Sequence, residues 1–216
     1  MNASKKWRLG VLLSGRGSNF SAIQEAIEKG QLPNTEVAIV VSNHTDAGGL
    51  TLAQSKGLKT ATFTKQHFEN RVAFDRAVAE TLQANQVDLV ILAGYDRIIS
   101  APLLEAYPAR ILNIHPSLLP AYGGKGMVGI KVHEAVVANR EAKSGCTVHI
   151  VTDVVDGGAM VGQRSIPVLD SDTPETLAAR ILEQEHQLYP QAIREFIAKH
   201  VAQEGETDSY ERNALV

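Results

Sequence analysis

The sequence predicts an α/β protein: a mostly parallel, twisted sheet with helices on both faces and antiparallel strands in its C-terminal part. In the first half of the 216 residues, short apolar runs alternate with segments whose apolar positions recur every three or four residues. Such alternation favours parallel strands covered by helices on both faces. In the second half, two strand-like runs flank the sequence Asp156-Gly157-Gly158, which is typical of a hairpin turn.

The individual elements follow from the same periodicities. Strands are expected at 8–13, 36–41, 60–63, 87–93 and 111–115, and helices at 19–29, 46–56, 71–84 and 101–107. A Gly- and Pro-rich loop at 117–129 precedes a helix at 131–139 and two strands at 145–152 and 161–169. A long last helix begins at Pro174 and is expected to be interrupted near Pro190, because proline lacks the N–H that a helix interior uses. A polar tail at about 203–216 is expected to be mobile.

Composition limits the function classes. With 21 basic and 24 acidic residues the formal net charge is -3, so no nucleic-acid partner is expected. No stretch approaches the roughly 20 apolar residues that span a membrane, and no membrane contact is expected. The single cysteine, Cys146, cannot form an intramolecular disulfide, which suits a cytoplasmic compartment. We expect one domain over 1–216, with a core at about 8–200, that binds small molecules as a monomer or weak homodimer.

A glycine loop, Ser14-Gly-Arg-Gly-Ser-Asn19, follows the first strand and opens the first helix. Its glycines allow a tight turn, and the free N–H groups at a helix start favour a phosphate. Phe20 stands where a dinucleotide-binding loop has its third glycine, and the Gly-Lys-Ser/Thr of a nucleotide P-loop is absent. A monophosphate therefore fits better than a dinucleotide. A plain turn from strand to helix is the alternative.

Two polar side chains share one face at the end of the strand 111–115. Side chains alternate along a strand, so Asn113 and His115 point the same way, and Pro116 ends the strand. Open α/β sheets bind ligands at the carboxyl ends of their strands. An amide beside an imidazole can stabilise a developing oxyanion and handle a proton. A structural histidine, hydrogen-bonded to the following loop, is the alternative.

Asp156 belongs to the predicted hairpin turn, and turn formation alone accounts for an Asp-Gly pair. Near His115, its carboxylate would favour the charged imidazolium, but the sequence does not establish that contact. His149, in the middle of a strand, is expected to be packed and hydrogen-bonded. No His, Cys, Asp or Glu residues have metal-binding spacing, so no metal is expected.

Several segments together resemble one enzyme family. The main ones are Val11-Leu-Leu-Ser-Gly-Arg-Gly-Ser-Asn19, Asn113-Ile-His-Pro-Ser-Leu-Leu-Pro120 and Val148-His-Ile-Val-Thr-Asp-Val-Val-Asp-Gly-Gly158, supported by Leu92-Ala-Gly-Tyr-Asp-Arg-Ile-Ile99 and Gln184-Glu-His-Gln-Leu-Tyr-Pro190. Over about residues 8–200 the chain resembles the phosphoribosylglycinamide formyltransferases, which are folate-dependent enzymes of purine biosynthesis. The Asn-x-His-Pro-Ser-Leu-Leu-Pro motif is specific to formyl-folate enzymes as a group. The Gly-Arg-Gly-Ser-Asn start narrows the resemblance to the glycinamide enzymes.

The resemblance implies a Rossmann-like sheet, 10-formyltetrahydrofolate as co-substrate and the amine of 5'-phosphoribosylglycinamide as formyl acceptor. By position it implies catalytic roles for Asn113, His115 and Asp156. It implies that the acceptor is bound by Gly17, Ser18, Asn19 and, at the ribose hydroxyls, Glu185. It implies that the formyl-folate is bound by Arg71, Asp96, Arg97, Ile98, Ile99, Asn113, Thr152, Asp153, Val154, Val155 and Asp156.

Two features depart from the family pattern. Asp96 stands where the family often has an apolar residue, and the loop 122–132 is longer and richer in glycine than the commonest family loop. We assign no role to Lys125 in that loop. The alternatives are another formyl-folate enzyme, such as a formyltetrahydrofolate hydrolase or a tRNA formyltransferase, and a non-catalytic Rossmann-like protein that binds a phosphorylated metabolite. The two enzymes usually carry an added N-terminal or C-terminal domain, which the length of this chain disfavours.

Overall fold

The computed structural model describes residues 6–213, with side chains described up to residue 202. Its centre is a seven-stranded sheet in the order β3-β2-β1-β4-β5-β6-β7. Five strands are parallel: β1 (Trp7–Leu13), β2 (Thr35–Ser42), β3 (Thr60–Thr62), β4 (Leu89–Leu92) and β5 (Ile111–His115). Two further strands, β6 (Lys143–Ile150) and β7 (Met160–Pro167), are antiparallel to their neighbours. The predicted fold class is confirmed, including the change to antiparallel pairing in the second half.

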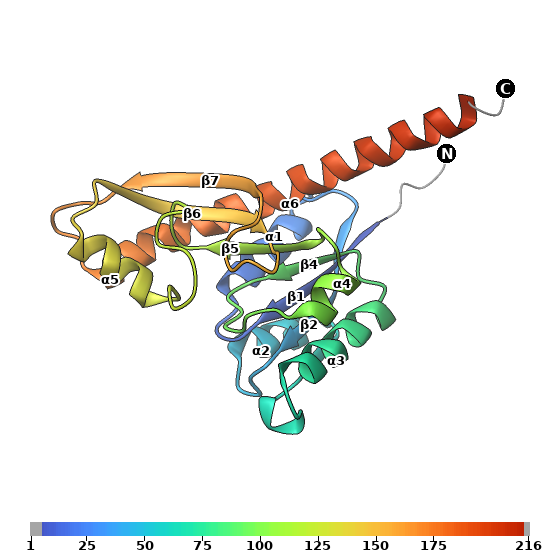
Figure 1. The fold of residues 1–216 in the computed structure, drawn as a ribbon, viewed down its shortest axis with the longest axis horizontal. Helices are drawn as coiled ribbons and strands as arrows, with labels where there is room; N and C mark the ends of the chain where they lie inside the picture. Colours follow the sequence, from blue (N-terminus) through green and yellow to red (C-terminus); the bar gives the residue numbers. More distant parts are fainter. Residues whose placement is uncertain (1–5, 214–216) are drawn as a thin grey trace.

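Helices cover both faces of the sheet (Figure 1). They are α1 (Ser18–Glu28), α2 (Gly48–Ser55), α3 (Arg71–Ala84), α4 (Ala101–Ala106), α5 (Ile130–Ala138) and α6 (Pro174–Asn213), with a 3₁₀ turn, η1, at Lys65–His67. One core cluster joins the sheet to α1, α2 and α6, and a second joins it to α3 and α4. Adjacent residues of β1 serve both, since Val11 packs in the first cluster and Leu12 in the second. This two-sided burial explains the continuous apolar runs of the inner strands.

The last helix differs from the prediction, because α6 continues through Pro190 and its backbone stays helical to Asn213. Residues on the sheet-facing side of this helix, Leu188, Tyr189, Ala192 and Ile193, are buried on both sides of the proline. The hydroxyl of Tyr189 lies 3.0 Å from the carbonyl oxygen of Leu92 and 2.9 Å from that of Leu112. We infer that this packing compensates for the hydrogen bond that the proline removes.

The tail that was expected to be mobile is helical as far as Asn213, and its mobility stays a prediction; residues 214–216 lie outside the described residues. The final turns of α6 extend beyond the sheet (Figure 1). Among the residues that the structure describes, no helix has the length and apolar character needed to cross a membrane.

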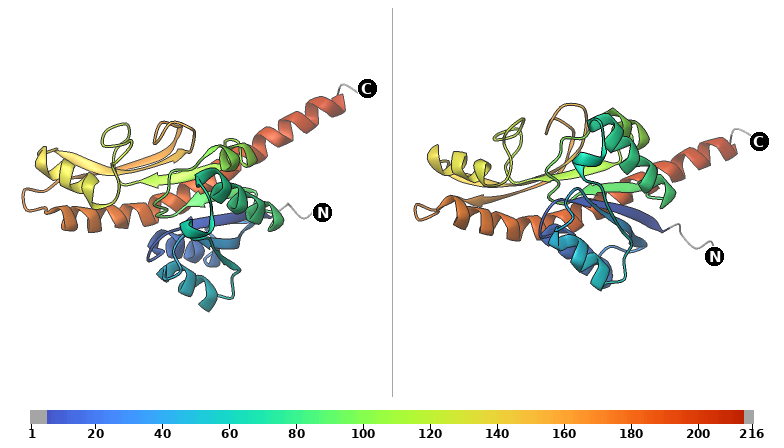
Figure 2. Two further views of the ribbon diagram at one scale, coloured as in Figure 1. Left: turned by 60° about the horizontal axis from the view of Figure 1, so that its bottom comes forward. Right: turned by 90° about the horizontal axis from the view of Figure 1, so that it is seen from below.

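The topology brings the polar segments of the sequence together at one edge of the sheet. Parallel strands β1, β4 and β5 lie side by side, so the loops that follow them emerge at the same edge. The loop between β6 and β7 and the Gly-rich loop after β5 approach this edge from the antiparallel side (Figure 2). The glycine loop, the Asn113–His115 strand end and the turn at Asp156 therefore become neighbours.

Candidate active site

A cavity of about 470 Å³ opens at the carboxyl ends of β4 and β5, a volume typical of small-molecule sites. Four chain segments form its walls: residues 94–99, the end of β5, the Gly-rich loop at 124–129, and the loop at 151–156. Asn19 of α1 and Glu185 of α6 complete it. The cavity therefore collects residues from almost the full length of the chain.

Asn113 and His115 both line this cavity from β5, as their same-face placement predicted. The antiparallel register sets Asn113 opposite His149 and His115 opposite Thr147. The residue His115 is 5% exposed, and its Nε2 lies 2.8 Å from the carbonyl oxygen of Tyr122. That carbonyl can only accept, so Nε2 of His115 carries a proton.

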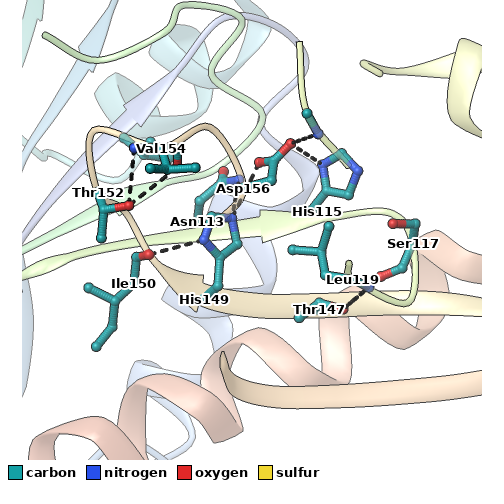
Figure 3. A network of polar contacts seen from close by, with 12 residues as sticks. Asn113, His115, Ser117, Leu119, Thr147, His149, Ile150, Thr152, Val154 and Asp156 are labelled. Atoms are coloured by element: carbon teal, nitrogen blue, oxygen red, sulfur yellow. Dashed lines mark hydrogen bonds and ion pairs between the residues drawn. The ribbon is translucent and has the colours of Figure 1, made fainter. Parts of the chain in front are cut away.

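The carboxylate of Asp156 reaches His115 from the loop between β6 and β7 (Figure 3). The distance from its Oδ2 to Nδ1 of His115 is 3.7 Å, and the same oxygen accepts a hydrogen bond from the N–H of Gly124 at 2.9 Å. Burial alone would raise the pKa of Asp156, but the hydrogen bond from the Gly124 N–H and the ion pair with His115 oppose that rise, and the pKa lies below the ordinary value. Asp156 is thus held as a carboxylate beside an imidazole with acceptors at both nitrogens.

His149 is a neighbour of the candidate catalytic residues that the sequence did not assign to the site. It is packed and hydrogen-bonded, as expected, but its partners are the candidate catalytic residues. Its Nε2 lies 3.1 Å from Nδ2 of Asn113 and 3.5 Å from Oδ1 of Asp156. The strand pairing contains a signal for this contact. His149 and Thr147 are two residues apart on one strand, so they share a face, and they lie opposite Asn113 and His115 on the neighbouring strand.

The Gly-rich loop contributes through its backbone. The carbonyl of Tyr122 faces His115, and the N–H of Gly124 faces Asp156. A Cβ added at Gly123 would lie 2.5 Å from Cδ2 of Leu119 and 3.4 Å from Cβ of Asp156. The backbone at Gly123 therefore passes close to the side chains of both residues. The sequence indicated a loop here, but it does not reveal which backbone groups meet which side chains. Lys125 lines the cavity.

The glycine loop opens α1 with a free helix start. Gly17 is the N-cap residue with φ 78°, and no side chain caps the helix. A Cβ at Gly17 would lie 2.7 Å from Cα of Gly49, so glycine here allows α2 to approach the loop closely. Ser18 lines a second, open groove between α1 and α6, of about 620 Å³. The uncapped N–H groups are the kind of donors that bind phosphate.

Asn19 and Glu185 form a buried pair at the other side of the main cavity. Nδ2 of Asn19 donates to Oε2 of Glu185 at 2.7 Å, and Glu185 is 7% exposed. Burial raises the pKa of Glu185 to about 7, and the bond from Asn19 opposes this only in part. Oδ1 of Asn19 is buried and has no hydrogen-bond partner among the described residues. Both side chains thus keep polar capacity for a ligand.

The structure brings most of the expected folate-binding residues to the cavity, but not all. Those that line it are Asp96, Arg97, Ile98, Ile99, Asn113, Thr152, Val154, Val155 and Asp156. Arg71, at the exposed start of α3, and Asp153 do not line it. The guanidinium of Arg97 stacks over the ring of Phe74, at 3.8 Å from the centroid.

Asp75 holds the cavity wall at 94–99 in place, a contact that no sequence pattern indicated. It is fully buried on α3, and its Oδ2 accepts from the N–H of Ser100 at 2.7 Å and from its Oγ at 2.5 Å. Burial raises the pKa of this carboxyl, while its bonds to Ser100 oppose the shift. Ser100 is the N-cap of α4, so one carboxyl fixes the end of the segment that carries Ile98 and Ile99.

The side chain of Asp96 is fastened at the rim of the cavity. Its oxygens lie 2.7 Å from Nδ2 of Asn43, 3.0 Å from Oγ of Ser14 and 3.0 Å from Nε2 of His44. These partners follow β1 and β2. Asp96 therefore connects the ends of three adjacent parallel strands, β1, β2 and β4.

Comparison with known proteins gives a consistent family. Residues 7–193 match the family described as formyl transferase. Phosphoribosylglycinamide formyltransferase of Haemophilus influenzae is 38% identical over 189 residues, which is 88% of this chain and 86% of that protein. The crystal structure of glycinamide ribonucleotide transformylase 1 from Symbiobacterium toebii has a TM-score of 0.84 and 45% identity, covering 89% of this chain and 88% of the other.

The fold, the polar cluster at its carboxyl edge and the match over 7–193 define the class: the chain belongs to the formyl transferase family. Three relatives at 38–43% identity, from Vigna unguiculata, Arabidopsis thaliana and Haemophilus influenzae, are phosphoribosylglycinamide formyltransferases. The chain spans 60% of the length of the chloroplastic relative from Vigna unguiculata, which is 43% identical, and 65% of the one from Arabidopsis thaliana.

Proposed function

We propose that this protein transfers the formyl group of 10-formyltetrahydrofolate to the amine of 5'-phosphoribosylglycinamide, in purine biosynthesis. The products are 5'-phosphoribosyl-N-formylglycinamide and tetrahydrofolate. The observation that carries the proposal is the convergence of Asn113, His115 and Asp156 on a cavity that also contains Asn19 and Glu185. The names of two bacterial relatives, phosphoribosylglycinamide formyltransferase, support the same acceptor and the same transferred group.

The two substrates would meet at the middle of this cavity. The free N–H groups at Gly17, Ser18 and Asn19 would bind the acceptor phosphate. Glu185, at about its midpoint of titration near neutral pH, would accept hydrogen bonds from the ribose hydroxyls. The apolar wall at Ile98 would contact the folate. The role predicted for Arg71 and Asp153 in folate binding stays a prediction.

The chemistry is an acyl transfer. The acceptor amine attacks the formyl carbon, a new C–N bond forms, and the bond from that carbon to the folate nitrogen breaks. One proton passes from the attacking nitrogen to the departing folate nitrogen, directly or through water. Asn113 would donate a hydrogen bond to the formyl oxygen as it gains negative charge. His115 would donate to the same oxygen from Nε2, in place of its bond to the Tyr122 carbonyl, and Asp156 at Nδ1 would favour the imidazolium.

The remaining properties follow from this chemistry. In the proposed mechanism Asn113 and His115 stabilise the developing charge, and we propose that no metal takes part. Cys146 is buried with a free thiol, which supports a reducing, cytoplasmic compartment. We propose that small molecules are the only ligands, and that the protein acts as a monomer or weak homodimer.

The test is an absorbance assay with purified protein, 10-formyltetrahydrofolate and 5'-phosphoribosylglycinamide. We expect tetrahydrofolate to form only when the acceptor is present, with one formylated acceptor per folate released. Release of folate and formate without acceptor would identify a hydrolase. No turnover, with folate or acceptor bound, would favour a non-catalytic binding protein.

A further inference from the structure

His149 is fixed against the candidate catalytic residues by the pairing of β5 with β6. It lies opposite Asn113 in the antiparallel register, and side chains of such opposed residues are in contact. Its side chain is 3% exposed, so its hydrogen-bonding partners are protein groups. Figure 3 shows its ring beside Asn113 and below Asp156.

The two nitrogens of this ring face different kinds of partner. Nδ1 lies 3.1 Å from the carbonyl oxygen of Ile150, and Nε2 lies 3.1 Å from Nδ2 of Asn113. The carbonyl can only accept, so Nδ1 carries the proton. The amide nitrogen can only donate, so Nε2 accepts. The ring that makes both bonds is the neutral Nδ1–H tautomer.

Asp156 is the competing partner for the same nitrogen. Its Oδ1 lies 3.5 Å from Nε2 of His149, farther than Nδ2 of Asn113. A proton on Nε2 would serve this carboxylate and would displace the amide nitrogen of Asn113, because two donors cannot share the contact. With Nε2 as an acceptor, His115 is the imidazole left to donate to Asp156.

We propose that His149 is a positioning residue that acts through Asn113. As a neutral acceptor it binds one N–H of the amide and so fixes which end of that amide is nitrogen. The second N–H of the same nitrogen then remains for the formyl oxygen. Without this acceptor the amide can turn by half a rotation and present its own oxygen to the growing oxyanion, which repels it. The catalytic consequence rests on the proposed function, whereas the tautomer does not.

The tautomer is tested first, on the wild-type protein without ligands. Nitrogen NMR of protein labelled with ¹⁵N-histidine distinguishes protonated from unprotonated ring nitrogens, and the His149→Gln spectrum assigns the signals by their absence. At neutral pH we expect Nδ1 of His149 to be protonated and Nε2 unprotonated. A protonated Nε2, in the neutral or the cationic ring, overturns the proposal. This result is independent of whether the protein transfers formyl groups.

Steady-state kinetics then test the route through Asn113. His149→Phe should lower kcat by about 10- to 100-fold, the loss known for residues that orient a metal ligand by a hydrogen bond, with both KM values within about twofold. His149→Gln, whose side-chain oxygen can accept near the position of Nε2, should recover most of the loss. His200→Phe is the matched control, because His200 also has Nδ1 near a backbone carbonyl, 3.0 Å from Phe196 O, but lies outside the cavity. It should leave kcat unchanged.

A double-mutant cycle decides between coupling and separate effects. In an Asn113→Ala background, His149→Phe should cause no further loss of kcat. A loss that multiplies with that of Asn113→Ala shows that His149 acts elsewhere, and overturns the proposal. If His149→Phe does not fold, His149→Gln and the wild-type spectrum still carry the test.

Discussion

Among the His–Asp pairs at the carboxyl edge of this sheet, the one with the shortest distance is not at the candidate reaction centre. His44 and Asp96 are 3.0 Å apart, with side chains 46% and 49% exposed. His115 and Asp156 are 3.7 Å apart, with side chains only 6% and 12% exposed. Water screens the first pair, so its Coulomb energy is small. The second pair is desolvated and has further partners at each end.

The difference shows what makes a pair of residues chemically useful. Both carboxylates line the cavity and have hydrogen-bonding partners, but only the side chain of Asp156 is largely buried, beside the imidazoles of His115 and His149. In such a site, charge and hydrogen bonds act at full strength on a bound carbonyl. A short distance at the surface gives only modest binding energy. Burial and convergence, rather than proximity alone, identify the reaction centre.

The largest effect is expected on breaking the buried pair. His115→Ala and Asp156→Asn should each lower kcat by at least about 10²–10³-fold, the range for loss of one oxyanion donor, because the imidazolium is lost or no longer favoured. Circular dichroism and thermal melting should show a folded protein in both cases. Near wild-type turnover for either variant removes that residue from the mechanism.

The second-largest effect is expected in the pH dependence of stability, in which the buried carboxyl of Glu185 should differ from exposed carboxyls. The pKa of Glu185 is raised to about 7 by burial. The protonated Glu185 side chain therefore contributes fully to stability below the pKa of the unfolded state. This contribution is lost as pH rises through about 7. The loss is up to about 3 kcal/mol, at roughly 1.4 kcal/mol per pKa unit. The melting temperature of Glu185→Gln, relative to that of wild type, should rise between pH 5 and pH 8.

The matched variant for this test is Glu175→Gln, because the pKa of Glu175 is lowered by hydrogen bonds at the start of α6 rather than raised. The melting temperature of Glu175→Gln, relative to that of wild type, should not rise between pH 5 and pH 8. A pH-independent gap between Glu185→Gln and wild type would contradict a raised pKa at Glu185.

The third effect extends the comparison from side chains to backbone at the acceptor end. Gly17→Ala should destabilise the protein by about 1–2 kcal/mol, because alanine is strained at positive φ, and the added Cβ would meet Gly49 at 2.7 Å. The free energy of unfolding from urea titration measures this. The acceptor KM should rise as well, since the phosphate-binding loop shifts.

Gly15→Ala provides the control within the same loop, since a Cβ at Gly15 would meet nothing within 4 Å. It should change neither stability nor the acceptor KM appreciably. Equal effects of the two alanines would show that space at Gly17 is not what the loop requires. Ser18→Ala and Asn19→Ala should likewise raise the acceptor KM more than they lower kcat; an unchanged acceptor binding constant in calorimetry would count against both assignments.

The smallest effect is expected at the exposed pair. His44→Gln should change stability by less than about 1 kcal/mol, as for other surface ion pairs, and should leave kcat within about twofold. The same substitution at His115 is the comparison. A large loss of kcat in His44→Gln would show that the exposed pair takes part in the reaction, and would break the distinction drawn from burial.

Local patterns predicted most of the fold, because strands and helices are specified by periodicity within a few neighbouring residues. The strand 111–115 and the helix 71–84 agree with the structure residue for residue. The break at Pro190 was wrong, since a local rule for proline ignores the long-range packing of Tyr189 against the sheet. Tertiary contacts of this kind are not encoded in a short window.

The candidate site divides in the same way. Asn113 and His115 could be paired from alternation alone, whereas the approach of Asp156 rested on the family resemblance and needed coordinates to be seen. The contacts of Tyr122 with His115 and of Gly124 with Asp156 are made by backbone atoms. Every residue has these atoms, so no side-chain pattern indicates the contacts. Arg71 was assigned by motif position, yet its side chain lies outside the cavity lining, because its place at the exposed start of α3 is set by the tertiary fold.

The most direct measurement is a crystal structure with a non-transferable formyl-folate analogue and 5'-phosphoribosylglycinamide bound together. The carbonyl oxygen of the analogue should lie about 2.7–3.2 Å from Nδ2 of Asn113 and from a ring nitrogen of His115, with the acceptor amine facing the carbonyl carbon. A bound pair of ligands whose carbonyl lies away from both side chains, for instance against the rim at Asp96, would contradict the assignment of the reaction centre.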